Sequence, residues 1–340
     1  MENNKKILII NSGGTICMSK TDGGYAPDLK VFRDSLDMLA ELRAPEMPSW
    51  EMINLEPLLD SSNIAVDEWN KIGKVIEDNY NEYDGFVILH GTDTMAYTAS
   101  VLSFALENLG KPVIITGAQI PLCELRSDGK DNLITSLMLA ASDKIFEVGI
   151  YFANKLFRGN CTIKFSASDF IAFNSPNLPP LATAGIHIDY NDALLLPRPT
   201  KPFRRQVIKN VPIGVIKVFP GIQFGLFERI MTENLKGIVV ETFGAGNIPN
   251  SSGSALLPII EKAYKNGCLI TVCTQCPQGT VMLGTYQTSS ALKAVGAVGG
   301  REMTTEAAVA KLYYLFSKDL TLDEIRKEME TPLRGEESHL

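Results

Sequence analysis

The chain has 340 residues, of which 45% are hydrophobic and 21% are charged, values that are typical of a globular protein. A length of 340 residues favours two domains over one. The net charge of −7 argues against a general nucleic-acid binder, because that function needs a basic surface.

Short apolar runs that end in small polar turns recur along the chain. The stretches between them are amphipathic: Val66–Tyr80 predicts one helix, and Asp128–Ser142 predicts another, capped by Ser127 or Asp128. The alternation of strand, turn and helix predicts an α/β fold with a doubly wound sheet. The predicted strands are 7–10, 86–89, 113–116, 214–218, 237–240 and 268–272.

The stretch 191–206 interrupts this alternation with three prolines and three arginines, which favours an extended connector. We expect an N-terminal α/β domain at 1–192, a linker at 193–210 and a smaller C-terminal α/β domain with a parallel sheet at 211–340. The final stretch, GEESHL, is expected to be a frayed tail.

The N-terminal stretch MENNKK precedes an apolar run of only four residues, which is too short for a signal peptide or a membrane helix. We therefore expect a soluble, cytoplasmic protein without a membrane partner. The single C-x-x-C pair, Cys273 and Cys276, has no second pair or histidine at zinc spacing. Free thiols and no metal site are expected.

The sequence contains three histidines and none of the G-x-S-x-G, H-E-x-x-H or G-x-x-x-x-G-K-[ST] motifs. His90 ends a predicted buried strand, so we interpret it as a hydrogen-bonded core histidine. If the protein is an enzyme, its nucleophile and base are not a serine–histidine pair.

Hydroxyl and carboxyl side chains gather instead in the turns after the predicted strands. In NSGGT, the pair Gly13-Gly14 allows a tight turn before Thr15, which could be a helix cap or a nucleophile. In HGTDT, Thr92 and Asp93 could face a ligand, although their spacing alone favours the cap of a helix at 95–108.

Two more turns add polar residues. LLDSSN places Asp60, Ser61 and Ser62 in a stretch that is equally compatible with a simple turn, and FRGNCTIK carries Lys164, a solvated surface lysine by default. Taken together with the turns at Thr15 and Thr92, they allow a threonine nucleophile paired with a lysine base.

These turns lie within motifs that resemble the bacterial-type L-asparaginases, and most of all their cytoplasmic type I branch. The resemblance covers essentially the whole chain. The motifs are GGTI at 13–16, LLDSSN at 58–63, VILHGTDTMAYTAS at 87–100, ITGAQIPLCELRSDGKDNL at 115–133, RGNCTIK at 158–164, GAGNIPN at 244–250, TQCPQG at 274–279 and GGREMTTEAAVAKL at 299–312.

The resemblance implies hydrolysis of L-asparagine to L-aspartate and ammonia, with a weak glutaminase side activity. It implies that Thr15 is the nucleophile and forms a β-aspartyl ester, that Thr92, Asp93 and Lys164 form a second catalytic group, and that Tyr25 lies on a mobile lid and hydrogen-bonds Thr15. No cofactor is implied.

The resemblance also implies that the substrate's α-amino and α-carboxylate groups are held by Asp60, Ser61, Ser62, Thr92 and Asp93. It implies a left-handed crossover in the larger domain and a homo-oligomer, either a dimer or a tetramer made of two dimers.

In such an assembly Asn247 is contributed by the neighbouring chain, although a turn role for it is equally compatible with the sequence.

The chain departs from the family pattern at an allosteric asparagine site that some type I enzymes carry. Ile163 and Glu241 stand where that site uses a hydroxyl and a basic residue, so that only Thr274 and Cys276 remain. We therefore expect weak or no allosteric activation.

Two alternatives stay open. The first is the asparaginase-like subunit of the transamidase that acts on tRNA, which normally carries an extra N-terminal domain; here the first strand is expected at Lys5 or Lys6. The second is a binding protein that kept the fold and lost the chemistry.

Overall fold

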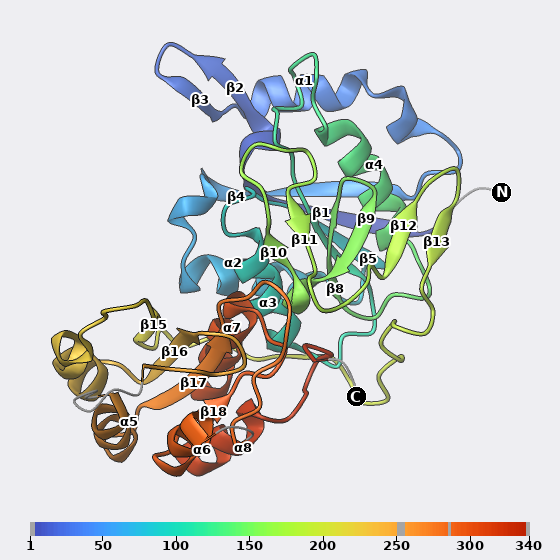
Figure 1. The fold of residues 1–340 in the computed structure, drawn as a ribbon. Coiled ribbons are helices and arrows are strands. Elements are labelled where there is room, and N and C mark those ends of the chain that lie inside the picture. Colours follow the sequence, from blue (N-terminus) through green and yellow to red (C-terminus); the bar gives the residue numbers. More distant parts are fainter. Residues whose placement is uncertain (1–3, 250–255, 285–286, 338–340) are drawn as a thin grey trace. The chain divides into compact units, whose positions relative to one another are not determined.

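The computed structural model describes residues 4–249, 256–284 and 287–337 (Figure 1). Two compact units divide between Gln206 and Val207, inside the expected linker. The proline-rich stretch packs on the first unit, where Phe203 stacks on Tyr80 with ring centroids 3.8 Å apart. Among the described residues, no helix is both long and apolar enough to cross a membrane.

The first unit is built on an eight-stranded mixed sheet, which confirms the predicted fold class. Strands β4, β1, β5, β7 and β8 run parallel, and β9, β12 and β13 continue the sheet in antiparallel pairs. In spatial order the strands are β13 (Ile188–Tyr190), β12 (Ala182–Ala184), β9 (Lys155–Arg158), β8 (Val148–Phe152), β7 (Val113–Thr116), β5 (Gly85–Leu89), β1 (Lys6–Gly13) and β4 (Ser49–Leu59).

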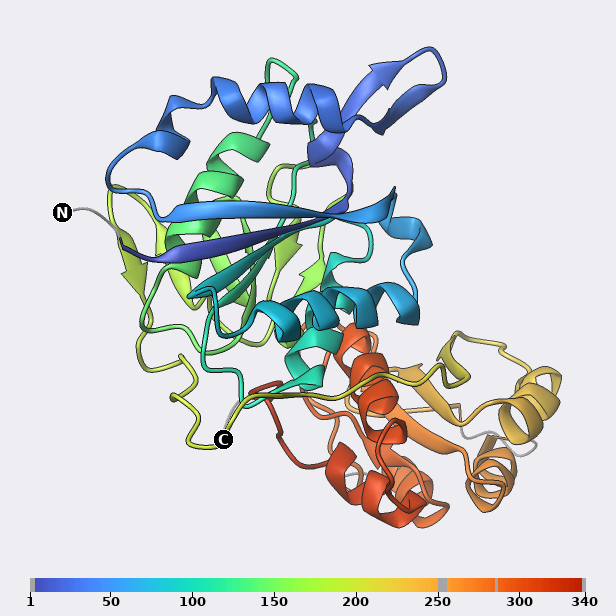
Figure 2. The same cartoon turned by 180° about the vertical axis from the view of Figure 1, so that it is seen from behind.

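Helices cover both faces of the large sheet (Figures 1 and 2), and alternate residues of the buried strands face one layer or the other. Ile7 and Ile9 of β1 share a hydrophobic cluster with residues of α1 and α4, and Leu8 and Ile10 share a second cluster with residues of α2 and α3. The helices are α1 (Leu29–Met38), α2 (Val66–Asn79), α3 (Met95–Ala105) and α4 (Gly129–Ala140).

The helical connections between the parallel strands do not all have the same hand. The connections β5–α3–β7 and β7–α4–β8 step in the same direction along the sheet, but α3 and α4 pack on opposite faces. Their hands are therefore opposite. The connection β4–α2–β5 steps in the same direction as β5–α3–β7 and has its helix on the same face. The connection β1–α1–β4 steps in the opposite direction and has its helix on the opposite face. These three connections therefore share one hand. Because such connections are almost always right-handed, β7–α4–β8 is the left-handed crossover.

Short elements complete the first unit. The predicted helix at 95–108 is shorter than expected, because α3 ends at Ala105 and Asn108 has a positive φ of 55°. Three two-stranded sheets lie outside the main sheet: β2 (Met18–Thr21) with β3 (Gly24–Pro27), β6 (Leu106–Glu107) with β14 (Arg204–Arg205), and β10 (Ile163–Lys164) with β11 (Phe173–Asn174).

The second unit contains a four-stranded parallel sheet, as predicted. Ile238, Val240 and Ile270 of this sheet pack in one cluster with Ile260 of α5. The strands are β15 (Ile213–Lys217), β16 (Gly237–Thr242), β17 (Leu269–Thr274) and β18 (Val298–Gly299), and the helices are α5 (Leu256–Lys265), α6 (Gln287–Ala294), α7 (Thr305–Phe316) and α8 (Leu322–Met329).

The expectation of a frayed C-terminal tail is wrong for the described part of GEESHL. The Glu336 carboxylate is buried and lies 2.7 Å from Nζ of Lys311, which is equally buried. Burial alone raises the pKa of Glu336, but Lys311 and the backbone N–H of Arg334 outweigh it, so that the pKa is lowered overall. An ion pair therefore ties the segment to α7. His339 lies outside the described residues.

Candidate active site

Three polar turns follow three neighbouring strands of the large sheet. Thr15 follows β1, Asp60 follows β4 and Thr92 lies after β5. Because these strands are parallel and adjacent, their carboxyl ends meet at one edge of the sheet, which is where ligands bind in doubly wound folds. Turns that are far apart in sequence thus form one region.

Glycines allow the three turns to touch. A Cβ on Gly14, whose φ is +85°, would lie 2.2 Å from the backbone nitrogen of Gly91. A Cβ on Gly91 would lie 2.5 Å from Oγ of Ser61. Thr94 Oγ1 also donates to the Ser61 carbonyl oxygen at 2.8 Å. These contacts add a close approach of backbones to the tight turn that the sequence predicts at Gly13-Gly14.

Lys164 reaches the Thr92 turn from β10. Its Nζ lies 2.9 Å from Thr92 Oγ1 and 2.5 Å from Asp93 Oδ1. Thr92 is 6% exposed, whereas 61% of the Asp93 side chain is exposed, so the carboxylate faces solvent. The helix-cap interpretation is wrong, because the N-cap position of α3 is Thr94 and neither Thr92 nor Asp93 caps it.

Thr15 is the first residue of a short 3₁₀ helix, η1 (Thr15–Cys17), and is partly exposed. Its hydroxyl makes no hydrogen bond with the other described residues. The side chain is therefore available to a ligand at the same sheet edge as Thr92.

Tyr25 is placed differently from the expectation. It lies on β3 of a β-hairpin, opposite Lys20, and is 52% exposed. Its hydroxyl donates to Glu124 Oε1 at 3.3 Å, and the expected hydrogen bond to Thr15 is not formed. The hairpin itself could have been predicted, because Asp22-Gly23 is the two-residue turn that favours one.

The turn after β4 is both a structural turn and a polar surface. Asp60 accepts a hydrogen bond from the backbone N–H of Ser62 at 3.1 Å and so caps η3 (Ser61–Asn63). Ser61 is buried, whereas Asp60 and Ser62 are exposed. Asp60 and Asp93 thus place two exposed carboxylates at this sheet edge, which suits a positively charged group on a ligand.

Two residues of the region were missed by the reasoning from sequence. Thr92 Oγ1 donates to Gln119 Oε1 at 3.2 Å, which places Gln119 beside the threonine–lysine contact. Asp128 occupies the N-cap position of α4, as predicted, but its side chain makes no capping hydrogen bond; its Oδ1 accepts from the backbone nitrogens of Gln119 and Ile120 at 3.0 Å each. The sequence around Asp128 has the pattern of a helix cap, so its contact with the backbone of residues 119–120 was not predicted.

The other five residues that the sequence analysis singled out do not belong to the three turns. Ile163 precedes Lys164 on β10. The other four belong to the second unit, where Asn247 is exposed in the turn after β16, Glu241 Oε1 accepts from Thr305 Oγ1 at 2.6 Å, and Thr274 Oγ1 accepts from the Cys276 backbone nitrogen at 3.0 Å.

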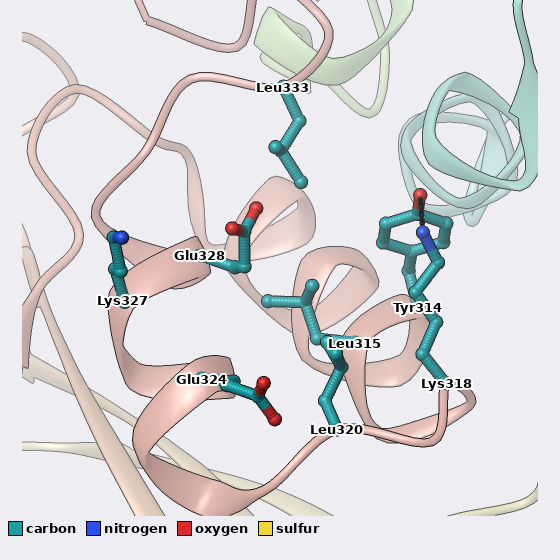
Figure 3. Close-up of a pocket in the computed structure, with 8 residues that line it drawn as sticks. All are labelled: Tyr314, Leu315, Lys318, Leu320, Glu324, Lys327, Glu328 and Leu333. Carbon is teal, nitrogen blue, oxygen red and sulfur yellow. Dashed lines mark hydrogen bonds between the residues drawn. The ribbon is translucent and has the colours of Figure 1, made fainter.

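A cavity of about 420 Å3 lies between α7 and α8 of the second unit (Figure 3). Its lining mixes lysines with glutamates, and Lys318 Nζ donates to the Tyr314 hydroxyl at 2.6 Å. It holds no threonine or cysteine nucleophile, so we place no catalytic site there. The lining residues are Tyr314, Leu315, Lys318, Leu320, Glu324, Lys327, Glu328 and Leu333.

No group of three histidine, cysteine, aspartate or glutamate side chains within the described ranges could hold a metal ion. The six cysteines are free thiols. Burial raises the pKa of the Cys273 thiol to about 12, so it is not a thiolate at neutral pH.

His90 is a core residue, as predicted. It is fully buried, its Nδ1 lies 2.7 Å from the carbonyl oxygen of Gly91, and its Nε2 lies 2.8 Å from Thr98 Oγ1. The carbonyl can only accept, so Nδ1 carries the proton and Nε2 accepts from Thr98. Trp69 Nε1 donates to the same hydroxyl at 3.1 Å. These bonds satisfy a neutral imidazole and leave no role as a base.

Burial lowers the pKa of His90 to about 4. An unfolded chain binds one more proton than the folded chain between pH 6.5 and pH 4, so the free energy of unfolding falls as the pH falls through that window, by about 3 kcal/mol in total. Urea unfolding at several pH values should show this slope. His90→Gln should lose it, and the exposed His187→Gln should keep it; equal slopes in all three proteins would contradict the assignment.

The fold and the site together define a class of protein. It is a two-domain α/β protein whose site of hydroxyl, lysine and carboxylate groups lies at the carboxyl ends of the strands of the larger sheet. A family model described as "Asparaginase, N-terminal" matches residues 6–195, and one described as "Glutaminase/Asparaginase C-terminal domain" matches residues 212–329. The chain therefore belongs to the asparaginase family.

Relatives support this assignment along the whole chain. L-asparaginase 1 of Escherichia coli is 45% identical over 98% of both chains. The crystal structure of L-asparaginase I from Vibrio cholerae is 43% identical, with a TM-score of 0.92 over 99% of this chain and 100% of that one. A glutamyl-tRNA(Gln) amidotransferase component of Pyrococcus abyssi is 32% identical over 97% of this chain and 76% of that protein.

Proposed function

We propose that this protein hydrolyses L-asparagine to L-aspartate and ammonia, with weak activity on L-glutamine. The observation that carries the proposal is the contact of Lys164 Nζ with Thr92 and Asp93 at the sheet edge that also bears Thr15. Family membership supports the reaction type.

In this mechanism the Thr15 hydroxyl oxygen attacks the side-chain amide carbon of asparagine and gives up its proton. The carbon–nitrogen bond then breaks, the amide nitrogen takes a proton, and ammonia leaves a β-aspartyl ester on Thr15. Water attacks the ester and releases aspartate, and Thr15 regains its proton. A threonine hydroxyl needs a base for the first step, and the Thr92–Lys164 pair supplies one without histidine, metal or cofactor.

Polar groups of the same turns would bind the substrate. The carboxylates of Asp60 and Asp93 attract the α-ammonium group, and the hydroxyls of Ser61 and Ser62 lie in the adjacent turn. Contribution of Asn247 by a neighbouring subunit of a dimer or tetramer stays a prediction, as does the cytoplasmic location.

The direct test is ammonia release by the purified protein from L-asparagine and, separately, from L-glutamine. Release from asparagine at a clearly higher kcat/KM supports the proposal. Tight asparagine binding without turnover would favour a binding protein that lost its chemistry. Preference for glutamine would favour an amidotransferase-like function, in line with the name of the Pyrococcus relative.

We expect a hyperbolic initial-rate curve in asparagine, with a Hill coefficient near one. Glu241 presents a carboxylate that already accepts from Thr305 and lies 3.9 Å from Lys217, so it would repel a second substrate's carboxylate. Thr274 Oγ1 is engaged by Cys276. A clearly sigmoidal curve would contradict this expectation.

A further inference from the structure

The side-chain amide of Gln119 joins two parts of the site. Its Oε1 accepts from Thr92 Oγ1 at 3.2 Å, and its Nε2 donates to the carbonyl oxygens of Asp169 at 3.0 Å and Ala167 at 3.4 Å. Both carbonyls belong to the turn between β10 and β11, the hairpin that carries Lys164. One amide therefore links the Thr92 turn to the Lys164 hairpin.

The orientation of this amide is fixed by its partners. Carbonyl oxygens only accept hydrogen bonds, so the amide nitrogen must face Ala167 and Asp169, and the amide oxygen must face Thr92. The backbone holds this position, because the Gln119 N–H donates to the two carboxylate oxygens of Asp128 at 3.0 and 3.1 Å.

The fixed oxygen sets the direction of the Thr92 hydroxyl. A protonated Lys164 can only donate, so Thr92 Oγ1 accepts from Lys164 and must give its own hydrogen to Gln119. The relay runs one way, from lysine to threonine to glutamine.

Resting on the proposed function, we propose that Gln119 is a positioning residue that fixes the direction of the Thr92 hydroxyl and the approach of Lys164. Asp93, at 2.5 Å, is the carboxylate that faces Lys164 from the Thr92 turn. Asp169 lies on the hairpin turn and accepts from the Ile171 backbone nitrogen.

Two variants separate the two halves of the amide. Gln119→Met removes the acceptor and both donors, and kcat should fall about tenfold with KM within about twofold of the wild-type value. Gln119→Glu keeps an acceptor for Thr92 Oγ1 but loses both donors to the hairpin, so its kcat should stay above that of Gln119→Met, with KM again within about twofold of the wild-type value.

Hydrogen exchange gives a readout that does not depend on turnover. Amides of residues 166–172 should exchange faster in both Gln119 variants, and at the wild-type rate in Gln206→Met, a matched change of a half-buried glutamine outside the site. If the wild type releases no ammonia, the proposed function fails and the exchange result still decides the positioning role. Unchanged exchange in Gln119→Met, an equal loss of kcat in both Gln119 variants, or a raised KM with unchanged kcat would each overturn the inference.

Discussion

Replacing Thr15 with alanine is expected to lower kcat for ammonia release from L-asparagine by at least about 10³-fold, because the variant has no hydroxyl to form the ester. Thr15→Ser keeps a hydroxyl at the same turn and should retain measurable turnover. Acid-quenched intact mass spectrometry should detect an aspartyl adduct on the wild-type protein during turnover and none on the alanine variant.

The fold provides the control for this experiment. Thr15 is partly exposed and its hydroxyl has no hydrogen bond to the described part of the chain, so Thr15→Ala should leave the melting temperature within about 1 °C of the wild-type value. Loss of activity can then be assigned to chemistry rather than to unfolding. Persistent turnover in Thr15→Ala would make the nucleophile assignment wrong, and Thr92 would be the next residue to test.

Lys311→Met is expected to cost about 3–5 kcal/mol of stability, because it leaves the Glu336 carboxylate buried without its cation. Lys311 Nζ also donates to the carbonyl oxygens of Thr331 at 2.7 Å and Met329 at 3.1 Å, so two further acceptors lose their donor. Thermal unfolding of the full chain should show a transition lowered by about 10 °C or more.

The double variant Lys311→Met/Glu336→Gln tests the cause, since it should recover a large part of the loss by removing the unpaired charge. The pH dependence has a definite sign. Without Lys311, burial raises the folded-state pKa of Glu336 above its unfolded value, so the deficit should shrink as the pH falls from 7 to 5. A deficit that is equal at both pH values and in both variants would mean that lost packing is the cause.

The strands and the domain class could be predicted because their signals are local. Apolar runs such as 86–89 and 113–116 match β5 and β7 within one residue, since a strand buried on both faces must be apolar throughout. β4 escaped prediction because it is an edge strand of the sheet, and its polar residues, such as Glu51 and Asn54, interrupt the apolar pattern.

The site was only partly predictable, because its remaining contacts connect distant segments. Nothing local in the sequence tells that Gln119 lies beside Thr92, or that the Asp128 carboxylate accepts from the backbone nitrogen of Gln119. The Lys311–Glu336 pair shows the same limit. A charged stretch near the chain end is usually solvated, and only the tertiary structure shows that Glu336 pairs with a buried lysine.

The left-handed connection through α4 gives the sheet a second topological switch point. Chains leaving β1 and β5 turn to opposite faces of the sheet, so Thr15 and Thr92 lie on the two sides of the first switch point. Because α4 also lies opposite α3, chains leaving β5 and β7 diverge as well, and Thr92 and Gln119 lie on the two sides of this second point. With a right-handed α4 the second divergence would disappear. The exceptional hand thus places Thr92 between two switch points, with the Thr15 turn on one side and Gln119, which accepts the hydrogen bond of its hydroxyl, on the other.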